Sequence, residues 1–133
     1  MLQRIQTLFL LLFCGVSLGN FFFFPVEIDV FSRPFGQQAA LLGYMPLVLT
    51  IIIFATIFLY KQRPRQVLIN RVVWVIFTLY WGSFVYFILQ AGNSFALYLP
   101  DLSLAFVGEV ALLLANRFIK KDEALVRSLD RLR

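Results

Sequence analysis

Residues 39–60 read AALLGYMPLVLTIIIFATIFLY, without one charged side chain, and the basic turn KQRPR follows at residues 61–65. A helix needs about 20 apolar residues to cross the hydrocarbon core of a bilayer, which is roughly 30 Å thick. The stretch therefore predicts a transmembrane helix that ends at a short, positively charged turn. Pro46 lies within it, and we expect a kink there because proline removes one helical hydrogen bond.

Three further apolar stretches of similar length complete the pattern. The prediction is an all-α membrane protein with four transmembrane helices, at residues 5–24, 39–60, 67–90 and 100–119. The composition agrees, because 61% of the 133 residues are hydrophobic and only 14% are charged, too few to cover a soluble domain. The chain then divides into a transmembrane bundle, residues 1–119, and a basic amphipathic tail, residues 120–133.

The basic residues are distributed unevenly about the four stretches. All 12 Lys and Arg residues except Arg33 lie near the start of the chain, around the connection between the second and third stretches, or near and after the end of the fourth. Positively charged loops remain on the cytoplasmic side during insertion, so this distribution predicts that both termini are cytoplasmic. A basic face on that side would lie next to anionic lipid headgroups, and nothing in the sequence requires contact with nucleic acid.

The first stretch has two possible fates. Ser17-Leu18-Gly19 places small residues where a signal peptidase could cleave. We favour a retained transmembrane helix, because only one basic residue precedes the stretch and apolar residues continue beyond that site. Gly15 and Gly19 have the GxxxG spacing that allows another helix to approach closely, although two small residues in an apolar helix need not have that role.

The residue types of common active sites are scarce. The sequence has no histidine and one cysteine, Cys14, which excludes imidazole catalysis, most zinc sites and an intrachain disulfide. It also has no glycine-rich phosphate loop and no carboxylate cluster with metal-ligand spacing. We therefore expect a protein that is not an enzyme, with no catalytic residues, no metal and no cofactor.

Glu109 is the chemically unusual residue of the fourth stretch. It lies eight residues after Asp101, about 12 Å along a helix, and therefore well inside the hydrocarbon. An ionisable residue at that depth costs several kcal/mol unless it is protonated or paired. Asn116 follows on nearly the same face and extends a polar seam. An adjacent face of small residues suits close helix packing and consists of Ala105, Gly108, Ala111 and Ala115.

Three roles for Glu109 remain open. Its carboxyl group can hydrogen-bond a neighbouring helix and fix the register of the bundle. Four side chains at matching depth are candidate partners, namely Ser17, Thr50, Ser83 and Tyr86. Glu109 can instead pair with a helix of a partner protein, or carry the proton of a small transporter. One carboxylate without a second intramembrane charge favours the structural role.

The tail is predicted to continue the fourth helix beyond the membrane. Leu125, Leu129 and Leu132 recur at helical spacing and form one apolar stripe. Glu123 and Arg127 form a favourable i,i+4 pair. One interpretation is a docking element for a cytoplasmic partner, made by Leu125, Arg127, Leu129, Arg131 and Leu132. The other is a solvated tail that lies along the membrane surface.

The two ends of the chain resemble a known family. MLQRIQT at residues 1–7, LANR at residues 114–117 and KKDEALVRSLDRLR at residues 120–133 are similar to a four-pass membrane family of Bacteroidota, called domain of unknown function 4293. The resemblance implies a protein of the bacterial inner membrane. It provides no catalytic residues and leaves the activity open, and Glu109 is not part of the matching motif.

Together these features predict a non-enzymatic accessory or scaffold subunit of a larger inner-membrane complex, with protein export as one candidate process. Its partners would be the lipid bilayer, another integral membrane protein or complex, and a cytoplasmic protein bound by the tail. The alternative is a small proton-coupled transporter that uses Glu109 and forms a homodimer, because four helices enclose little volume.

Overall fold

The computed structural model describes residues 2–23, 39–59, 62–90 and 95–130. Every element in these segments is a helix, which confirms the all-α class. The four α-helices are α1 (Leu2–Phe23), α3 (Met45–Ile57), α4 (Arg63–Gln90) and α5 (Leu99–Asp130). Two short 3₁₀ helices precede α3 and α5, namely η1 (Ala39–Tyr44) and η2 (Phe95–Tyr98).

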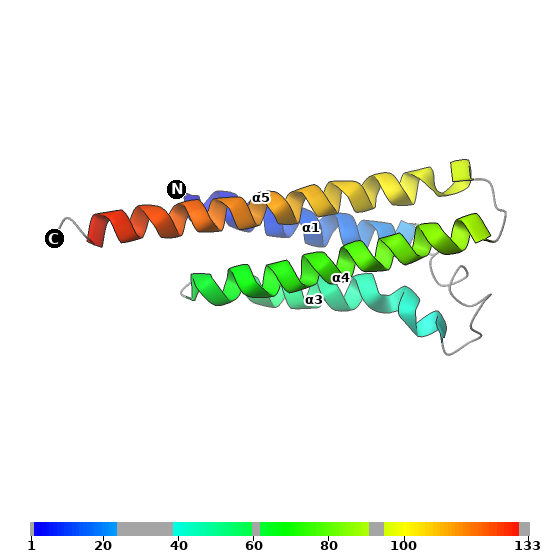
Figure 1. The fold of residues 1–133 in the computed structure, drawn as a ribbon, viewed down its shortest axis with the longest axis horizontal. Helices are drawn as coiled ribbons and strands as arrows, with labels where there is room; N and C mark the ends of the chain where they lie inside the picture. Colours follow the sequence, from blue (N-terminus) through cyan, green and yellow to red (C-terminus); the bar gives the residue numbers. More distant parts are fainter. Residues whose placement is uncertain (1, 24–38, 60–61, 91–94, 131–133) are drawn as a thin grey trace.

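The helices form one elongated bundle (Figure 1). α5 packs against both α1 and α4, and α3 also packs against both of them. The beginning of α1 and the last turns of α5 lie at the same end of the bundle. A hydrogen bond from Gln6 Nε2 to Phe118 O, at 3.3 Å, joins the two helices near that end.

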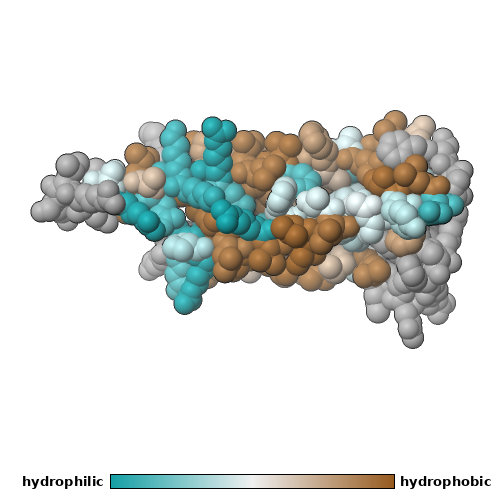
Figure 2. Space-filling model, viewed as in Figure 1, coloured by the Kyte–Doolittle hydropathy of each residue, from teal (hydrophilic) through white to brown (hydrophobic). Residues whose placement is uncertain are grey.

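The bundle has the surface of a membrane protein. α1, α4 and α5 are long and apolar enough to cross a membrane, judged by length and composition, and α3 belongs to a shorter apolar helix, Leu42–Ile57. Large apolar side chains are exposed around the bundle, among them Leu8, Leu79 and Phe106. The face drawn in Figure 2 has a broad band of hydrophobic surface crossed by a strip of more polar residues, and hydrophilic residues gather towards the C-terminal end of α5. Such a band is unfavourable in water and suits lipid.

The region of the predicted second span differs from the prediction. Instead of one helix with an internal kink at Pro46, it contains η1 followed by α3. Pro46 occupies the first turn of α3, where its missing N–H would have had no helical partner. The proline therefore starts a helix rather than bending one. α3 ends at Ile57 and is followed by a turn in which the Leu59 N–H donates to Thr56 O at 3.0 Å.

The start of α4 and the end of α5 also differ from the bounds of the predicted spans. α4 begins at Arg63, earlier than the predicted residue 67, because Pro64 suits a first helical turn. α5 runs without interruption through the predicted fourth span and into the tail. The predicted helical continuation is confirmed as far as Asp130, and residues 131–133 lie outside the described part of the chain. At 1.5 Å per residue, the 32 residues of α5 extend for about 48 Å.

The core is aromatic and close-packed. Phe13 of α1 meets Phe77 of α4 edge-to-face, with ring centroids 5.2 Å apart. Trp81 continues the cluster, at 6.0 Å from Phe77. Tyr80 and Trp81 are both buried. The aromatic core therefore ties α4 to α1 across the bundle.

The small-residue face of α5 is buried as predicted. Ala105, Ala111 and Ala115 belong to the core. A Cβ atom added at Gly108 would lie 3.4 Å from Phe13 Cδ2, so the glycine allows a large ring to pack directly on the helix backbone. Gly15 has no such neighbour among the described residues. The GxxxG spacing of α1 is therefore not used for packing within this part of the chain.

Candidate functional site

The polar residues of α5 meet α4 along one seam. Thr78 Oγ1 of α4 lies 2.8 Å from Glu109 Oε1 of α5. The same hydroxyl oxygen lies 2.9 Å from Trp74 O. The single hydroxyl proton of Thr78 can be donated to Glu109 Oε1 or to Trp74 O. A bond between α4 and α5 is the kind of contact that a register-fixing carboxyl group would make.

The four side chains expected to contact Glu109 have other partners, and the expectation about them was wrong. Their hydrogen bonds run from Ser17 and Thr50 to Pro46 O, from Ser83 to Tyr80 O, and from Gln90 to the Tyr86 hydroxyl. The four side chains were chosen only because they lie at the same depth in the membrane as Glu109. Rotation of each helix about its axis decides which side chain at that depth faces α5.

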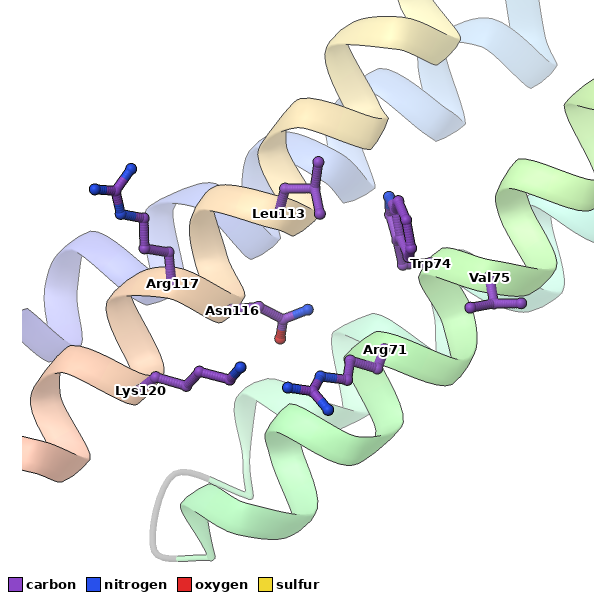
Figure 3. A pocket seen from close by; sticks show the side chains of 7 residues that line it. All are labelled: Arg71, Trp74, Val75, Leu113, Asn116, Arg117 and Lys120. Atoms are coloured by element: carbon purple, nitrogen blue, oxygen red, sulfur yellow. The ribbon is translucent and has the colours of Figure 1, made fainter.

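A pocket of about 370 Å³ lies between α4 and α5, beside the contact between Thr78 and Glu109. Its polar lining includes Arg71 from α4 with Asn116 and Lys120 from α5. In Figure 3, Arg71 and Lys120 reach towards each other across the pocket, and Asn116 points into the space between them. The Arg117 side chain also lines the pocket, but its guanidinium group is directed away. Trp74, Val75 and Leu113 complete the wall with apolar surface.

The charges of this pocket are unbalanced. The ion pairs formed within the described segments join Arg63 to Asp122, at 3.0 Å, and Arg127 to Glu123, at 2.6 Å. Neither includes Arg71 or Lys120. The ion pair of Arg63 with Asp122 connects α4 to α5 on one side of the pocket. The hydrogen bond between Thr78 and Glu109 connects the same helices on the other side. Two unpaired cations at a concave site favour an anion.

Comparison with known proteins gives the chain its family. The family model described as domain of unknown function, DUF4293, matches residues 2–132. The chain belongs to this family. No curated protein and no solved structure matches it. The resemblance expected from the two ends of the sequence is therefore confirmed and extends over nearly the whole chain.

The buried state of Asn116 was not evident from the sequence of this DUF4293 protein. Asn116 was expected on the polar seam with Glu109, and it is buried there at 8% exposure. Its Oδ1 atom has no hydrogen-bond partner within the described segments. An unsatisfied buried amide oxygen costs about 1–3 kcal/mol.

The predicted docking residues of the tail are only partly described. Leu125 and Arg127 are exposed on the last turns of α5. Leu129 belongs to α5, but its side chain lies outside the described set, as do Arg131 and Leu132 entirely. The apolar stripe of the tail is thus represented by Leu125, which is 46% exposed.

Two buried polar contacts were missed by sequence reasoning. Asp101, near the start of α5, is buried, and its carbonyl oxygen accepts a hydrogen bond from Asn20 Nδ2 at 3.5 Å. Near the other end of the bundle, Gln66 Nε2 of α4 donates to Thr56 O of α3 at 3.2 Å. Both contacts join the ends of neighbouring helices. The signal that could have found them is a polar residue at the edge of an apolar span, on the helix face that also carries core residues.

Proposed function

We propose that this protein is a non-enzymatic accessory or scaffold subunit of a larger complex in the bacterial inner membrane, with protein export as a candidate process. The observation that carries the proposal is the extension of α5, which projects past the other helices in Figure 1. Its last turns expose Leu125 and Val126. A helix that presents apolar side chains beyond the membrane suits a groove on a partner protein.

The proposal includes four membrane crossings with both termini in the cytoplasm. The 13 residues of α3 extend for about 20 Å. The 6 residues of η1 add about 12 Å, because the rise per residue is larger in a 3₁₀ helix. That reach is close to the thickness of a hydrocarbon core of roughly 30 Å. The basic residues at the end shared by α1 and the tail support a cytoplasmic location for that end.

Reporter fusions test this topology. Fusions after Arg33, Arg65, Ser94 and Arg133 should report exterior, cytoplasm, exterior and cytoplasm. A cytoplasmic signal after Arg33 would contradict the orientation. Cleavage of the chain near Gly19 would contradict a retained first helix.

The docking role is tested with two matched variants of the tail. Purification in mild detergent followed by mass spectrometry should recover a stoichiometric partner with the wild-type protein. Leu125→Asp should weaken that association at least about tenfold, because a buried leucine contributes roughly 1.5–3 kcal/mol and an unpaired carboxylate adds a penalty. Ala124→Asp introduces the same charge one position away and should keep the partner.

Two outcomes would count against the docking role. One is a protein recovered only as a lone monomer. The other is equal partner recovery with Leu125→Asp and wild type. If the tail only lies on the membrane surface, neutralising Arg127 should weaken its binding to lipid, and added salt should weaken that binding too. Contact with an apolar groove on a partner should persist under both changes.

The alternative function is a small proton-coupled transporter, homodimeric, that uses Glu109. The position of Glu109 on the seam, beside a pocket, favours this second candidate. Proteoliposomes with wild type and Glu109→Gln would distinguish the two functions. Proton-linked flux that disappears in Glu109→Gln supports transport, whereas no flux, or flux unaffected by the substitution, removes it.

A further inference from the structure

The pocket between α4 and α5 combines three properties that rarely occur together on a lipid-facing surface. It is concave, two of its three cationic side chains point into it, and one of its walls is apolar. Arg71 and Lys120 approach each other from opposite helices (Figure 3). Like charges so placed repel one another unless an anion lies between them. Neither cation has an ion-pair partner among the described residues, so both are available to an anion.

Asn116 adds a polar side chain to the wall of the pocket. Its side chain is more than nine-tenths buried and points into the pocket between the two cations. Its Oδ1 atom accepts no hydrogen bond from the described residues. That oxygen is itself enclosed, so a ligand in the pocket can reach only the amide nitrogen, which can donate a hydrogen bond to a phosphate oxygen. The pocket therefore suits a phosphate group.

The apolar wall of the pocket favours a lipid over a soluble anion as the ligand. Val75 and Leu113 line the pocket and are each about half exposed. The apolar surface continues along both helices away from the cations, through Leu79 and Val110. An acyl chain attached to the phosphate would lie along this surface. A soluble phosphate would leave it unused.

We propose that the α4–α5 pocket binds the headgroup of an anionic phospholipid, with its phosphate between Arg71 and Lys120 and next to the amide group of Asn116. Basic pockets between transmembrane helices have this affinity because cations neutralise the phosphate while neighbouring apolar side chains accompany the acyl chains. The site does not depend on the accessory role of the protein. The bound lipid would have a structural or regulatory role at the contact between α4 and α5.

Native mass spectrometry of the full-length protein in detergent tests the proposal. Phosphatidylglycerol and phosphatidylcholine are added separately at equal concentrations, and the retained lipid is counted. We expect one phosphatidylglycerol to bind in preference to phosphatidylcholine. Removing both cations, in Arg71→Gln with Lys120→Gln, should weaken binding about 25-fold, or about fivefold for each charge.

Lys121→Gln is the matched control. Lys121 is exposed and adjacent to Lys120, but it is not part of the pocket. Its substitution removes the same charge from the same helix and should leave lipid retention unchanged. The melting temperature of each variant in detergent without added lipid verifies that the fold is retained. Asn116→Leu should weaken phosphatidylglycerol binding without changing the small retention of phosphatidylcholine.

Soluble competitors distinguish the two sources of phosphate. Inorganic phosphate and glycerol 1-phosphate, at the concentration of the lipid, should bind far more weakly than phosphatidylglycerol. Equal binding of these compounds would assign the pocket to a soluble anion and overturn the lipid proposal. Equal retention of the two lipids, or an effect of Lys121→Gln as large as that of the double variant, would show general surface attraction and overturn it as well.

Discussion

The two sides of α5 are built in different ways. On the side of α1, packing is close and largely apolar: Phe9 stacks on Phe118 with ring centroids 5.5 Å apart, and Gly108 lets Phe13 approach the helix backbone. On the side of α4, the contacts include the bond of Thr78 to Glu109 and an open pocket. Inside a membrane, apolar burial does not distinguish helix from lipid, so close packing holds helices together. The α1 side has the properties of a structural interface, and the α4 side carries the candidate site.

The largest expected effect comes from the core between α1, α4 and α5. Phe13 is fully buried, and Phe13→Ala should destabilise the protein by about 3–5 kcal/mol, because it removes packing and leaves a cavity. Reversible unfolding in mixed micelles measures this loss. Phe106→Ala on the exposed surface of α5 is the control and should have little effect. Similar losses for both variants would mean that the close packing of α1 on α5 is not what stabilises the bundle.

A smaller effect is expected from a side chain added between α1 and α5. Gly108→Leu should destabilise the protein by about 1–3 kcal/mol, because the new side chain meets Phe13 and cannot fit without displacement. Gly15→Leu, on α1, adds the same group where no described atom lies within 4 Å of the added Cβ. It should be nearly neutral in the same unfolding measurement. A harmful Gly15→Leu together with a neutral Gly108→Leu would reverse the assignment of the two glycines.

The smallest effect is expected on the α4 side. A double-mutant cycle with Thr78→Val and Glu109→Gln should give a coupling free energy of about 1 kcal/mol, typical of hydrogen bonds between transmembrane helices. A coupling near zero would show that the two side chains do not stabilise the bundle through each other. A coupling of several kcal/mol would show that the seam is as structural as the α1 side, and the contrast between the two sides would disappear.

The sequence predicts the apolar spans because hydropathy and length are local properties. The effect of Pro46 was misjudged, because an apolar stretch does not reveal where a 3₁₀ turn gives way to an α-helix.

The site was less predictable than the fold. Glu109 and Asn116 were evident as polar residues in an apolar helix, but their surroundings depend on the rotation of α4 and on its register with α5. Thr78, the partner of Glu109, therefore escaped notice. Arg71 and Lys120 were recognised only as charges that orient the chain. Their convergence at one pocket requires two antiparallel helices in a particular register, which no local pattern encodes.

Thiol labelling at two adjacent positions of α5 tests the contrast between its sides most directly. Lys120 lines the pocket, whereas Ile119 is fully buried. In a Cys14→Ala background, Lys120→Cys should react with a membrane-impermeant maleimide in inverted membrane vesicles but not in intact spheroplasts. Ile119→Cys should remain unlabelled in both. Equal labelling of the two positions would contradict a closed side and an open side of α5, and labelling of Lys120→Cys from the spheroplast exterior would contradict a pocket that opens to the cytoplasm.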